Sequence, residues 1–333
     1  MECGRSHSNE THSLPLRISV ALCTYNGERY LREQLNSIAS QTRVPYEVVI
    51  CDDNSTDATL DIVESFVQSV SFRVRVEHNS LRLGSTHNFE KAIQSCTGDL
   101  IALCDQDDVW RPDKLSVQAA RFESDSSIGG LFSDASLVDS ESNSMGRTLW
   151  QSIDFRPDRQ RQVQAGKTAT VLLSQSVVTG ATLMFRAELI PLVCPIPSSW
   201  VHDGWIAWII ALHSKLDLIQ EPLSSYRIHS IQQYGVLPSI RMRICKRQKA
   251  AFSEYLDCVR QLQDLCSYLD KRWGAKFSFS MSFIRSKIRH LNMRANLPQN
   301  RLLRLLRVLP EVKNYREFSK GWKSLFKDVM IRC

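Results

Sequence analysis

The sequence predicts an α/β fold, in which a mostly parallel sheet carries helices on both faces, followed by a basic helical C-terminal region. Two observations predict the sheet: apolar runs alternate with amphipathic stretches over residues 17–104, and polar turns follow three of these runs. Repeated strand–turn–helix units are typical of parallel sheets covered by helices. A third observation, an excess of basic residues after position 240, sets the C-terminal region apart.

The spacing of apolar residues places the first elements. Unbroken apolar runs and strict alternation indicate strands, and apolar residues three or four positions apart indicate helices. The expected strands are residues 17–22, 47–51, 72–76 and 100–104, and the expected helices run through 30–38, 60–66 and 88–94.

The polar turns TYNGE, CDDNSTD and CDQDD follow the first, second and fourth of these strands. Ligands of such sheets bind beyond the carboxyl ends of the strands, so the turns are expected to line one site. Asp53 is suited to accept a hydrogen bond from a base or a ribose hydroxyl, while Ser55 or Asp57 caps the next helix. Tyr25 either packs beside a base or fills the core.

The third turn crowds three carboxylates, those of Asp105, Asp107 and Asp108, at a strand end. A divalent cation offsets their repulsion, and oxygen ligands of this kind recruit Mg²⁺ or Mn²⁺, with substrate phosphates completing the shell. The alternative is a solvated turn that caps the following helix, because acidic turns are common.

Length and cysteine usage narrow the class of protein. The 333 residues suffice for one large domain or two ordinary ones. The ten cysteines are scattered without a CxxC pair, which favours a reducing compartment. No stretch approaches the roughly 18 apolar residues that a membrane span needs, and the N-terminus lacks the apolar core of a signal peptide. These features predict a cytoplasmic protein.

Charge divides the chain unevenly. Residues 241–333 hold 22 Lys and Arg against 7 Asp and Glu, whereas residues 1–240 hold 20 against 28. This asymmetry suggests an anionic membrane surface or another polyanion as partner; the alternative is that the basic region partly balances the acidic one internally. Nucleic acid is not expected, because no zinc, stacking or groove-reading motif accompanies the charge.

Residues 301–309 give the clearest amphipathic pattern of the basic region. One helical face is apolar and the opposite one basic, with Leu302, Leu305, Leu306 and Leu309 facing away from Arg301, Arg304 and Arg307. Such a helix suits a membrane interface. The equal alternative is a helix that packs on the enzyme and leaves a solvated basic face.

Four motifs, in order, resemble those of the family 2 glycosyltransferases, whose A-type, Rossmann-like fold binds nucleotide-diphosphate sugars. They are ISVALCTYNGERYLREQLNSIASQT, EVVICDDNSTDAT, LRLGSTHNFEKAI and GDLIALCDQDDVWRPDKL, and the resemblance extends over residues 16–235. It is greatest to bacterial rhamnosyltransferase-like enzymes of surface polysaccharide assembly.

The resemblance implies roles for the donor-side residues. Asp53 matches the contact to the base, and Asp105 and Asp107 match the DxD motif, in which Asp107 holds the metal on the diphosphate. The matching nucleotide turn contains Thr24, Tyr25, Asn26 and Glu28.

The resemblance also implies an acceptor side. Asp203, in the segment HDGW, matches the general base, and His202 either orients it or binds acceptor. On position alone, Asp203 is more simply a charge favoured by the helix dipole. The segment SYRIH resembles one that closes over the donor, with Arg227 as a phosphate contact and His229 as a metal or diphosphate contact; a structural hydrogen bond is the alternative for His229.

The expected function is therefore inverting, metal-dependent sugar transfer with Mg²⁺ or Mn²⁺. A dTDP-sugar, dTDP-rhamnose above all, is the favoured donor and a UDP-sugar the second. The acceptor is expected to be a polysaccharide or lipid-linked saccharide, with the enzyme peripheral on the inner membrane face.

The expected organisation is a flexible tail over residues 1–15, a catalytic domain over 16–240 and a basic helical extension over 241–333. The catalytic domain divides into a nucleotide-binding half (16–115) and an acceptor-binding half (116–240). A nucleotidyltransferase is the same-fold alternative, although TYNGE lacks the Gly-rich basic loop of such enzymes. A non-catalytic membrane- or polysaccharide-binding protein is disfavoured by the intact set Asp105, Asp107 and Asp203.

Overall fold

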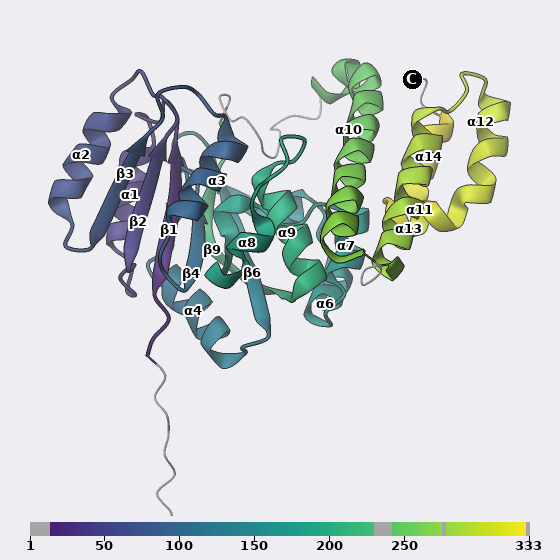
Figure 1. Cartoon of the computed structure of the whole chain (residues 1–333). Helices are drawn as coiled ribbons and strands as arrows, with labels where there is room; N and C mark the ends of the chain where they lie inside the picture. The colour runs from purple at the N-terminus through teal and green to yellow at the C-terminus, as the bar shows by residue number, and fades with distance from the viewer. Residues whose placement is uncertain (1–13, 230–241, 275–277, 331–333) are drawn as a thin grey trace, which may run out of the picture.

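The computed structural model describes residues 14–229, 242–274 and 278–330. It confirms the predicted α/β class: one large sheet lies between layers of helices, and further helices follow it (Figure 1). The predicted tail therefore lies almost entirely outside the described residues, as does the predicted junction near residue 240.

The strands run along most of the first two thirds of the chain. They are β1 (Ile18–Thr24), β2 (Glu47–Asp52), β3 (Arg73–His78), β4 (Leu100–Cys104), β5 (Val109–Trp110), β6 (Ile128–Val138), β7 (Ser144–Thr148), β8 (Leu183–Arg186) and β9 (Lys215–Arg227).

The helices cover the sheet and then form the C-terminal extension. They are α1 (Leu31–Ala39), α2 (Thr59–Ser69), α3 (Ser85–Ser95), α4 (Lys114–Ser124), α5 (Leu149–Ser152), α6 (Pro157–Gln164), α7 (Thr168–Ser174), α8 (Ile190–Val193), α9 (His202–His213), α10 (Met242–Trp273), α11 (Ser278–Ala295), α12 (Arg301–Val308), α13 (Val312–Phe318) and α14 (Trp322–Met330). Short 3₁₀ turns η1 (Gly180–Thr182), η2 (Ala187–Leu189) and η4 (Leu309–Glu311) join some of them.

The sheet is mixed, with the order β3-β2-β1-β4-β8-β6-β9-β5 and β7 paired to β6. The first four strands are parallel, as predicted. β8 lies antiparallel between β4 and β6, so that β6 and its parallel neighbour β9 run in the direction of the first four strands. The carboxyl ends of β1, β2 and β4 therefore meet at one edge, which places their polar turns together.

Alternation along the central strands feeds two cores, one on each face of the sheet. Ile18, Val20 and Leu22 of β1 pack with α1, α2 and α4 on one face. Ala21 and Cys23 point to the other face, where α3, α9, α10 and α11 contribute most of the covering side chains. The helices on both faces confirm the predicted layers. Cys23, Cys51 and Cys104 lie buried in these strands as free thiols, the small hydrophobes expected of them.

The C-terminal helices dock on the segment that precedes α9. The indole of Trp200 donates to the carbonyl of Gln261 on α10 at 3.0 Å, and the Ser199 hydroxyl donates to Asp264 at 2.5 Å. The Tyr268 hydroxyl donates to the carbonyl of Leu192. These contacts hold α10 against the helix that carries Asp203. Within the part of the chain that the structure describes, no helix is both long and apolar enough to cross a bilayer.

Candidate active site

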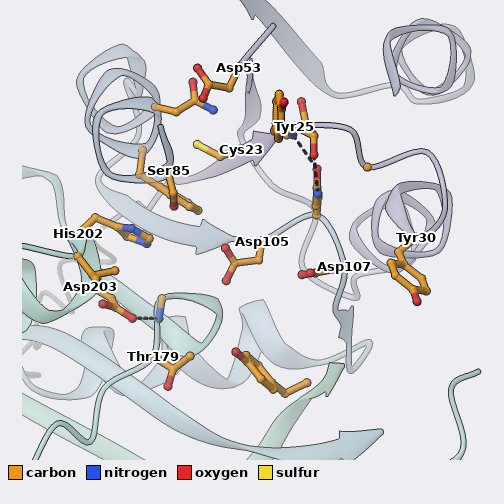
Figure 2. A pocket seen from close by; sticks show the side chains of 18 of the residues that line it. Cys23, Tyr25, Tyr30, Asp53, Ser85, Asp105, Asp107, Thr179, His202 and Asp203 are labelled. Carbon is orange, nitrogen blue, oxygen red and sulfur yellow. Dashed lines mark hydrogen bonds between the residues drawn. The ribbon is translucent and has the colours of Figure 1, made fainter. Parts of the chain in front are cut away.

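A pocket of about 610 Å³ opens at the carboxyl ends of β1, β2 and β4. Its lining comes from the three polar turns, from the start of α3, from η1 and from the start of α9. Figure 2 shows Asp53 and Tyr25 on one side, His202, Asp203 and Thr179 on the other, and Asp105 between them. Residues from both halves of the catalytic domain therefore face one space.

The two adjacent aspartates at the end of β2, Asp52 and Asp53, make different contacts. Asp52 is fully buried and accepts from Thr24 Oγ1 at 2.8 Å, from Ser55 and from His78, which fastens the strand ends together. Asp53 lines the pocket, and its carboxylate accepts from the backbone N–H groups of Leu83 and Gly84 at 2.7 and 2.8 Å. Asp53 thus also anchors the loop before α3, which sequence reasoning did not foresee.

Hydrogen bonds to the turns after β4 and β2 fix the first polar turn beside the pocket. Gln106 bridges both backbone groups of Tyr25, accepting from its N–H at 2.8 Å and donating to its carbonyl at 3.1 Å. Asn26, in the left-handed region with φ of 47°, accepts from Thr56 N–H through its side chain. Any side chain at Gly27 would collide with the Gln106 amide, so glycine permits this bridge. Thr24, Tyr25 and Asn26 all line the pocket.

Two of the predicted site residues, Glu28 and Arg227, do not line the pocket. Glu28 accepts from Ala58 N–H at 3.1 Å, and its own N–H donates to Asp57, so it ties the first turn to the start of α2. Asp57 also accepts from Thr59 N–H there, but the N-cap of α2 is Ala58 and no side chain caps it, so the predicted cap at Ser55 or Asp57 is wrong. Arg227 is buried and donates to Glu33 at 2.5 Å and to the carbonyl of Asp107 at 2.8 Å. Its guanidinium therefore positions the acidic turn from behind.

The acidic turn concentrates negative charge with little compensation. Burial, followed by the charges of Asp107 and Asp203, raises the pKa of Asp105 to about 8. Burial, followed by the charges of Asp107 and Asp105, raises the pKa of Asp108 well above its usual range. Lys114 is the buried cation nearby: its ammonium donates to the Ala181 carbonyl at 2.6 Å, and burial lowers its pKa to about 8. The buried Lys114 thus lies near Asp105 and Asp108.

His229 lies against this cluster, with Nε2 2.8 Å from a carboxylate oxygen of Asp107. Its ring packs on Tyr30 at a centroid distance of 4.9 Å. No three His, Cys, Asp or Glu side chains form a ready-made metal site within the described ranges. The residues nonetheless fit a hard divalent cation, because Asp105 and Asp107 supply crowded carboxylates on the pocket wall and substrate phosphates can complete such a shell.

Asp203 is in the first turn of α9, on the pocket wall opposite the nucleotide turns. Its carboxylate accepts from the backbone N–H of Gly180 at 3.0 Å and of Gly204 at 2.6 Å. The two backbone donors orient the carboxylate on the pocket wall. The charge of Asp203 contributes to the raised pKa of Asp105, so the carboxylates on the two walls of the pocket interact electrostatically.

His202 is 4 % exposed and stacks on Phe89 with ring centroids 3.9 Å apart. Neither ring nitrogen has a hydrogen-bond partner among the residues that the structure describes, and burial lowers the pKa of the ring. A Cβ at Gly180 would approach Nε2 to 2.8 Å, so the glycine keeps room beside the imidazole. The pocket therefore contains a neutral, unpartnered imidazole next to Asp203, suited to a hydroxyl-bearing ligand.

Several lining residues escaped sequence reasoning. Arg82 holds its guanidinium 3.9 Å from the ring centroid of Tyr25, and Gln106, Asn88 and Tyr226 complete the wall. Gln106 was visible as the middle residue of the DxD motif. Arg82 lies in the motif LRLGSTHNFEKAI, but no role could be assigned to it from the sequence, because only the fold brings the loop before α3 beside the first turn.

The mixed sheet and the carboxylate-lined pocket at its carboxyl edge agree with the predicted A-type, Rossmann-like fold. Residues 19–172 match the model of glycosyl transferase family 2. An uncharacterized glycosyltransferase of Nostoc sp. is 29% identical over 230 residues, which cover 66% of this chain and 67% of that protein. One from Methanocaldococcus jannaschii is 26% identical over 221 residues, covering 65% and 72%.

The chain also resembles TarS of Staphylococcus aureus, a poly(ribitol-phosphate) beta-N-acetylglucosaminyltransferase, with 37% identity over 108 residues. That match covers 32% of this chain and 18% of TarS. The crystal structure of TarS 1–349 in complex with UDP-GlcNAc has a TM-score of 0.53 and 18% identity, over 93% of this chain and 90% of that one. The structural likeness extends the shared fold well beyond the segment of sequence similarity.

Proposed function

We propose that this glycosyltransferase moves a sugar from a nucleotide-diphosphate sugar to a saccharide acceptor, with inversion and with the help of Mg²⁺ or Mn²⁺. One observation carries the proposal: a single pocket is lined by the nucleotide turn, by Asp105 and Asp107, and by Asp203 on the opposite wall. Such a transfer needs a site for the diphosphate beside a site for the attacking hydroxyl, and the pocket offers both.

On the donor side, Thr24, Tyr25, Asn26 and Asp53 bind the nucleoside, with Asp53 as acceptor for the base or ribose. Asp105 and Asp107 would hold the metal, with His229 beside Asp107 as a ligand or diphosphate contact. When bound, the cation neutralises the negative charge that develops on the leaving diphosphate. Glu28 and Arg227 support this side through the turns that they brace, and Arg227 reaches phosphate only if its contact with Glu33 opens.

On the acceptor side, Asp203 takes the proton of the attacking hydroxyl as the new bond forms. Its two backbone donors fix the carboxylate on the pocket wall. His202 supplies a neutral imidazole that binds a neighbouring hydroxyl of the acceptor.

The favoured donor is dTDP-rhamnose, with a UDP-sugar second, because the motifs resemble those of rhamnosyltransferase-like enzymes. The proposed acceptor is a growing polysaccharide or a lipid-linked saccharide of cell-surface polysaccharide synthesis, and the enzyme works from the cytoplasmic side of the membrane. The basic C-terminal region, with 22 Lys and Arg against 7 Asp and Glu, supports a place at an anionic surface.

A thermal-shift screen of sugar nucleotides, each with and without Mn²⁺ or Mg²⁺, tests this function. A ligand that binds the folded state raises the melting temperature by mass action, so the true donor should stand out only in the presence of metal. The hydrolysis of that donor should then depend on the same metal. If no sugar nucleotide shifts the melting temperature and none is hydrolysed, the proposed activity is wrong.

A further inference from the structure

Helix α12 turns its leucines toward solvent. The exposed fractions are 67% for Leu302, 60% for Leu306 and 51% for Leu309, which follows the helix in η4. These three residues, called here the outer leucine face, lie within less than one quarter of the helix circumference at helical spacing. Side chains of this size normally bury their surface, so an exposed row of them needs a partner.

The buried side of the same helix carries an arginine, Arg304, that is bonded to backbone carbonyls. Arg304 is 2 % exposed, and its guanidinium donates to the carbonyls of Pro298, Gln299 and Asp328. Val308 packs beside it in a small core with Tyr315 and Leu325. The amphipathic pattern is therefore as predicted, but its basic side includes an arginine that packs inward. The alternative prediction, in which the leucines pack on the enzyme, is wrong for this helix.

Helix α14 repeats the arrangement. It packs against α12, and its exposed side carries Trp322, Phe326 and Met330, which are 58%, 65% and 44% exposed. Leu325 of the same helix is buried. Figure 1 places α12 at the end of the molecule opposite β3, so the sheet does not cover these side chains. Two adjacent helices thus each present an apolar row away from the enzyme.

Cations surround the two rows. Arg301 and Arg307 flank the outer leucine face, and Lys323 and Lys327 flank the aromatic row of α14. Residues 301–330 hold eight Lys and Arg against three Asp and Glu. Of the acids, Asp328 is paired with Arg294. The net charge around the apolar rows is therefore positive.

The exposed apolar rows and the positive charge beside them together favour one binding partner for this surface. A second copy of the chain would bring two positively charged surfaces together, which repel each other. Leucine and aromatic side chains between Lys and Arg are what an interfacial helix presents to a bilayer with anionic headgroups. The cations meet the headgroups while the apolar rows enter the acyl boundary.

We propose that α12 and α14 form a membrane-insertion surface, in which Leu302, Leu306, Leu309, Trp322 and Phe326 enter the headgroup boundary of an anionic bilayer. The inference deepens the proposed function, since it names the surface that brings the enzyme to a lipid-linked acceptor. Insertion, rather than charge alone, supplies the holding interaction, and binding therefore persists in part when salt screens the cations.

The test uses the full-length protein and sedimentation with phosphatidylcholine vesicles, with and without phosphatidylglycerol. The variant L302Q/L306Q/L309Q should lose vesicle partitioning by about tenfold or more, because three exposed apolar side chains no longer enter the bilayer. Trp322→Gln with Phe326→Gln should produce a similar loss on its own. The control L14Q/V44Q/V67Q changes three exposed apolar residues outside the C-terminal helices and should bind as wild type.

Each outcome has a definite reading. Binding of wild type only to anionic vesicles, weakened but not abolished by high salt and lost in both variants, supports the proposal. Equal partitioning by wild type and the leucine variant overturns it, as does wild type that binds no vesicle. A concentration-dependent dimer that the leucine variant abolishes would instead assign the surface to a second copy. Donor hydrolysis in solution reports on the proposed chemistry separately, and all these variants should retain it.

Discussion

The pocket and the C-terminal helices both contain buried charged side chains, but they differ in whether an opposite charge lies beside each of them. In the pocket, the buried Lys114 lies near Asp105 and Asp108, and burial with mutual repulsion raises the pKa of both carboxyl groups. Behind the acidic turn, the buried Arg227 is paired with Glu33. In the C-terminal helices, Arg294 and Asp328 form a buried pair at 2.6 Å. Charge left uncompensated indicates a ligand, whereas compensated charge indicates a structural role.

The same two regions also treat apolar surface differently. The sheet buries most of its aliphatic side chains in two cores, while α12 and α14 expose rows of apolar side chains. The C-terminal helices thus pair charges inside and expose apolar side chains, the arrangement on which the proposed membrane-insertion surface rests. The comparison therefore predicts that carboxylates of the pocket affect function with little effect on stability, and that Asp328 does the reverse.

Asp107→Ala should produce the largest effect, the loss of metal-dependent donor binding with the fold intact. Removal of one of several crowded carboxylates relieves repulsion, which offsets the lost contact to His229. Calorimetric titration of the donor with and without Mn²⁺ measures it, and Asp61→Ala, at an exposed site on α2, serves as the control. A variant that binds donor as wild type does, with the same metal dependence, would remove Asp107 from the site.

Asp203→Asn should reduce turnover by roughly 10²–10⁴-fold, the usual contribution of a general base, with donor affinity little changed. Asparagine has one oxygen and can accept from only one of Gly180 and Gly204, which donate to different oxygens of Asp203, so thermal unfolding of the variant should be measured beside its kinetics. Steady-state kinetics with saturating donor measure the effect. Normal turnover in the variant would mean that another group takes the proton.

Asp328→Ala should destabilise the C-terminal helices by roughly 3–5 kcal/mol, because it leaves the buried guanidinium of Arg294 without its counter-ion. The Tyr315 hydroxyl also loses its acceptor, 2.7 Å away. Asp99→Ala breaks the exposed pair with Arg17 and should cost only about 0–1 kcal/mol. Chemical denaturation compares the two variants, and equal losses would refute the distinction between the regions.

Asp53→Ala should weaken binding of every nucleotide tried, including free nucleoside diphosphate, by roughly 1.5–3 kcal/mol for a lost charged hydrogen bond. Because Asp53 also accepts from Leu83 and Gly84, the loop before α3 should loosen as well. Hydrogen exchange in that loop separates this second effect from the first. Unchanged affinity for the nucleoside diphosphate would leave Asp53 with the structural role alone.

The smallest expected effect is a loss of stability in the C-terminal helices under mild acid. Burial, opposed by Glu311 and reinforced by Arg294 and Lys287, lowers the pKa of His290 to about 4. The stabilisation is therefore complete above the unfolded pKa of about 6.5 and is lost as the pH falls toward 4. His290→Gln should flatten that part of the stability profile, measured by denaturation at several pH values. An unchanged profile would assign the acid sensitivity to other groups.

The sequence predicted the first half of the fold closely, since the apolar runs at 17–22, 47–51, 72–76 and 100–104 all became parallel strands. The resemblance also indicated a strand over residues 179–185, but the structure forms the 3₁₀ turn η1 at Gly180–Thr182 and only then β8, which runs antiparallel between β4 and β6. An apolar run at 179–185 indicates a strand but carries no information on direction, which depends on where the chain returns to the sheet.

The candidate site was predicted in part for the same reason. The alternation of strands and helices predicted that the turns after the parallel strands lie at one edge of the sheet. Tyr25, Asp53 and Asp105 of these turns do line the pocket. Arg82 lies in a loop whose neighbour is set by tertiary structure alone. The amphipathic pattern of α12 likewise predicted an apolar and a basic face, but not which of them packs inward. That depends on the backbone carbonyls that accept from Arg304, whose positions only the fold determines.

The most direct test of the account measures donor affinity and turnover together, on the same preparations of wild type, Asp107→Ala and Asp203→Asn. One pocket with a donor side and an acceptor side predicts that the two variants separate: Asp107→Ala loses metal-dependent donor binding, whereas Asp203→Asn binds donor normally and fails in turnover. If Asp203→Asn loses donor affinity while bound donor still turns over, the division of the pocket into these two sides is contradicted.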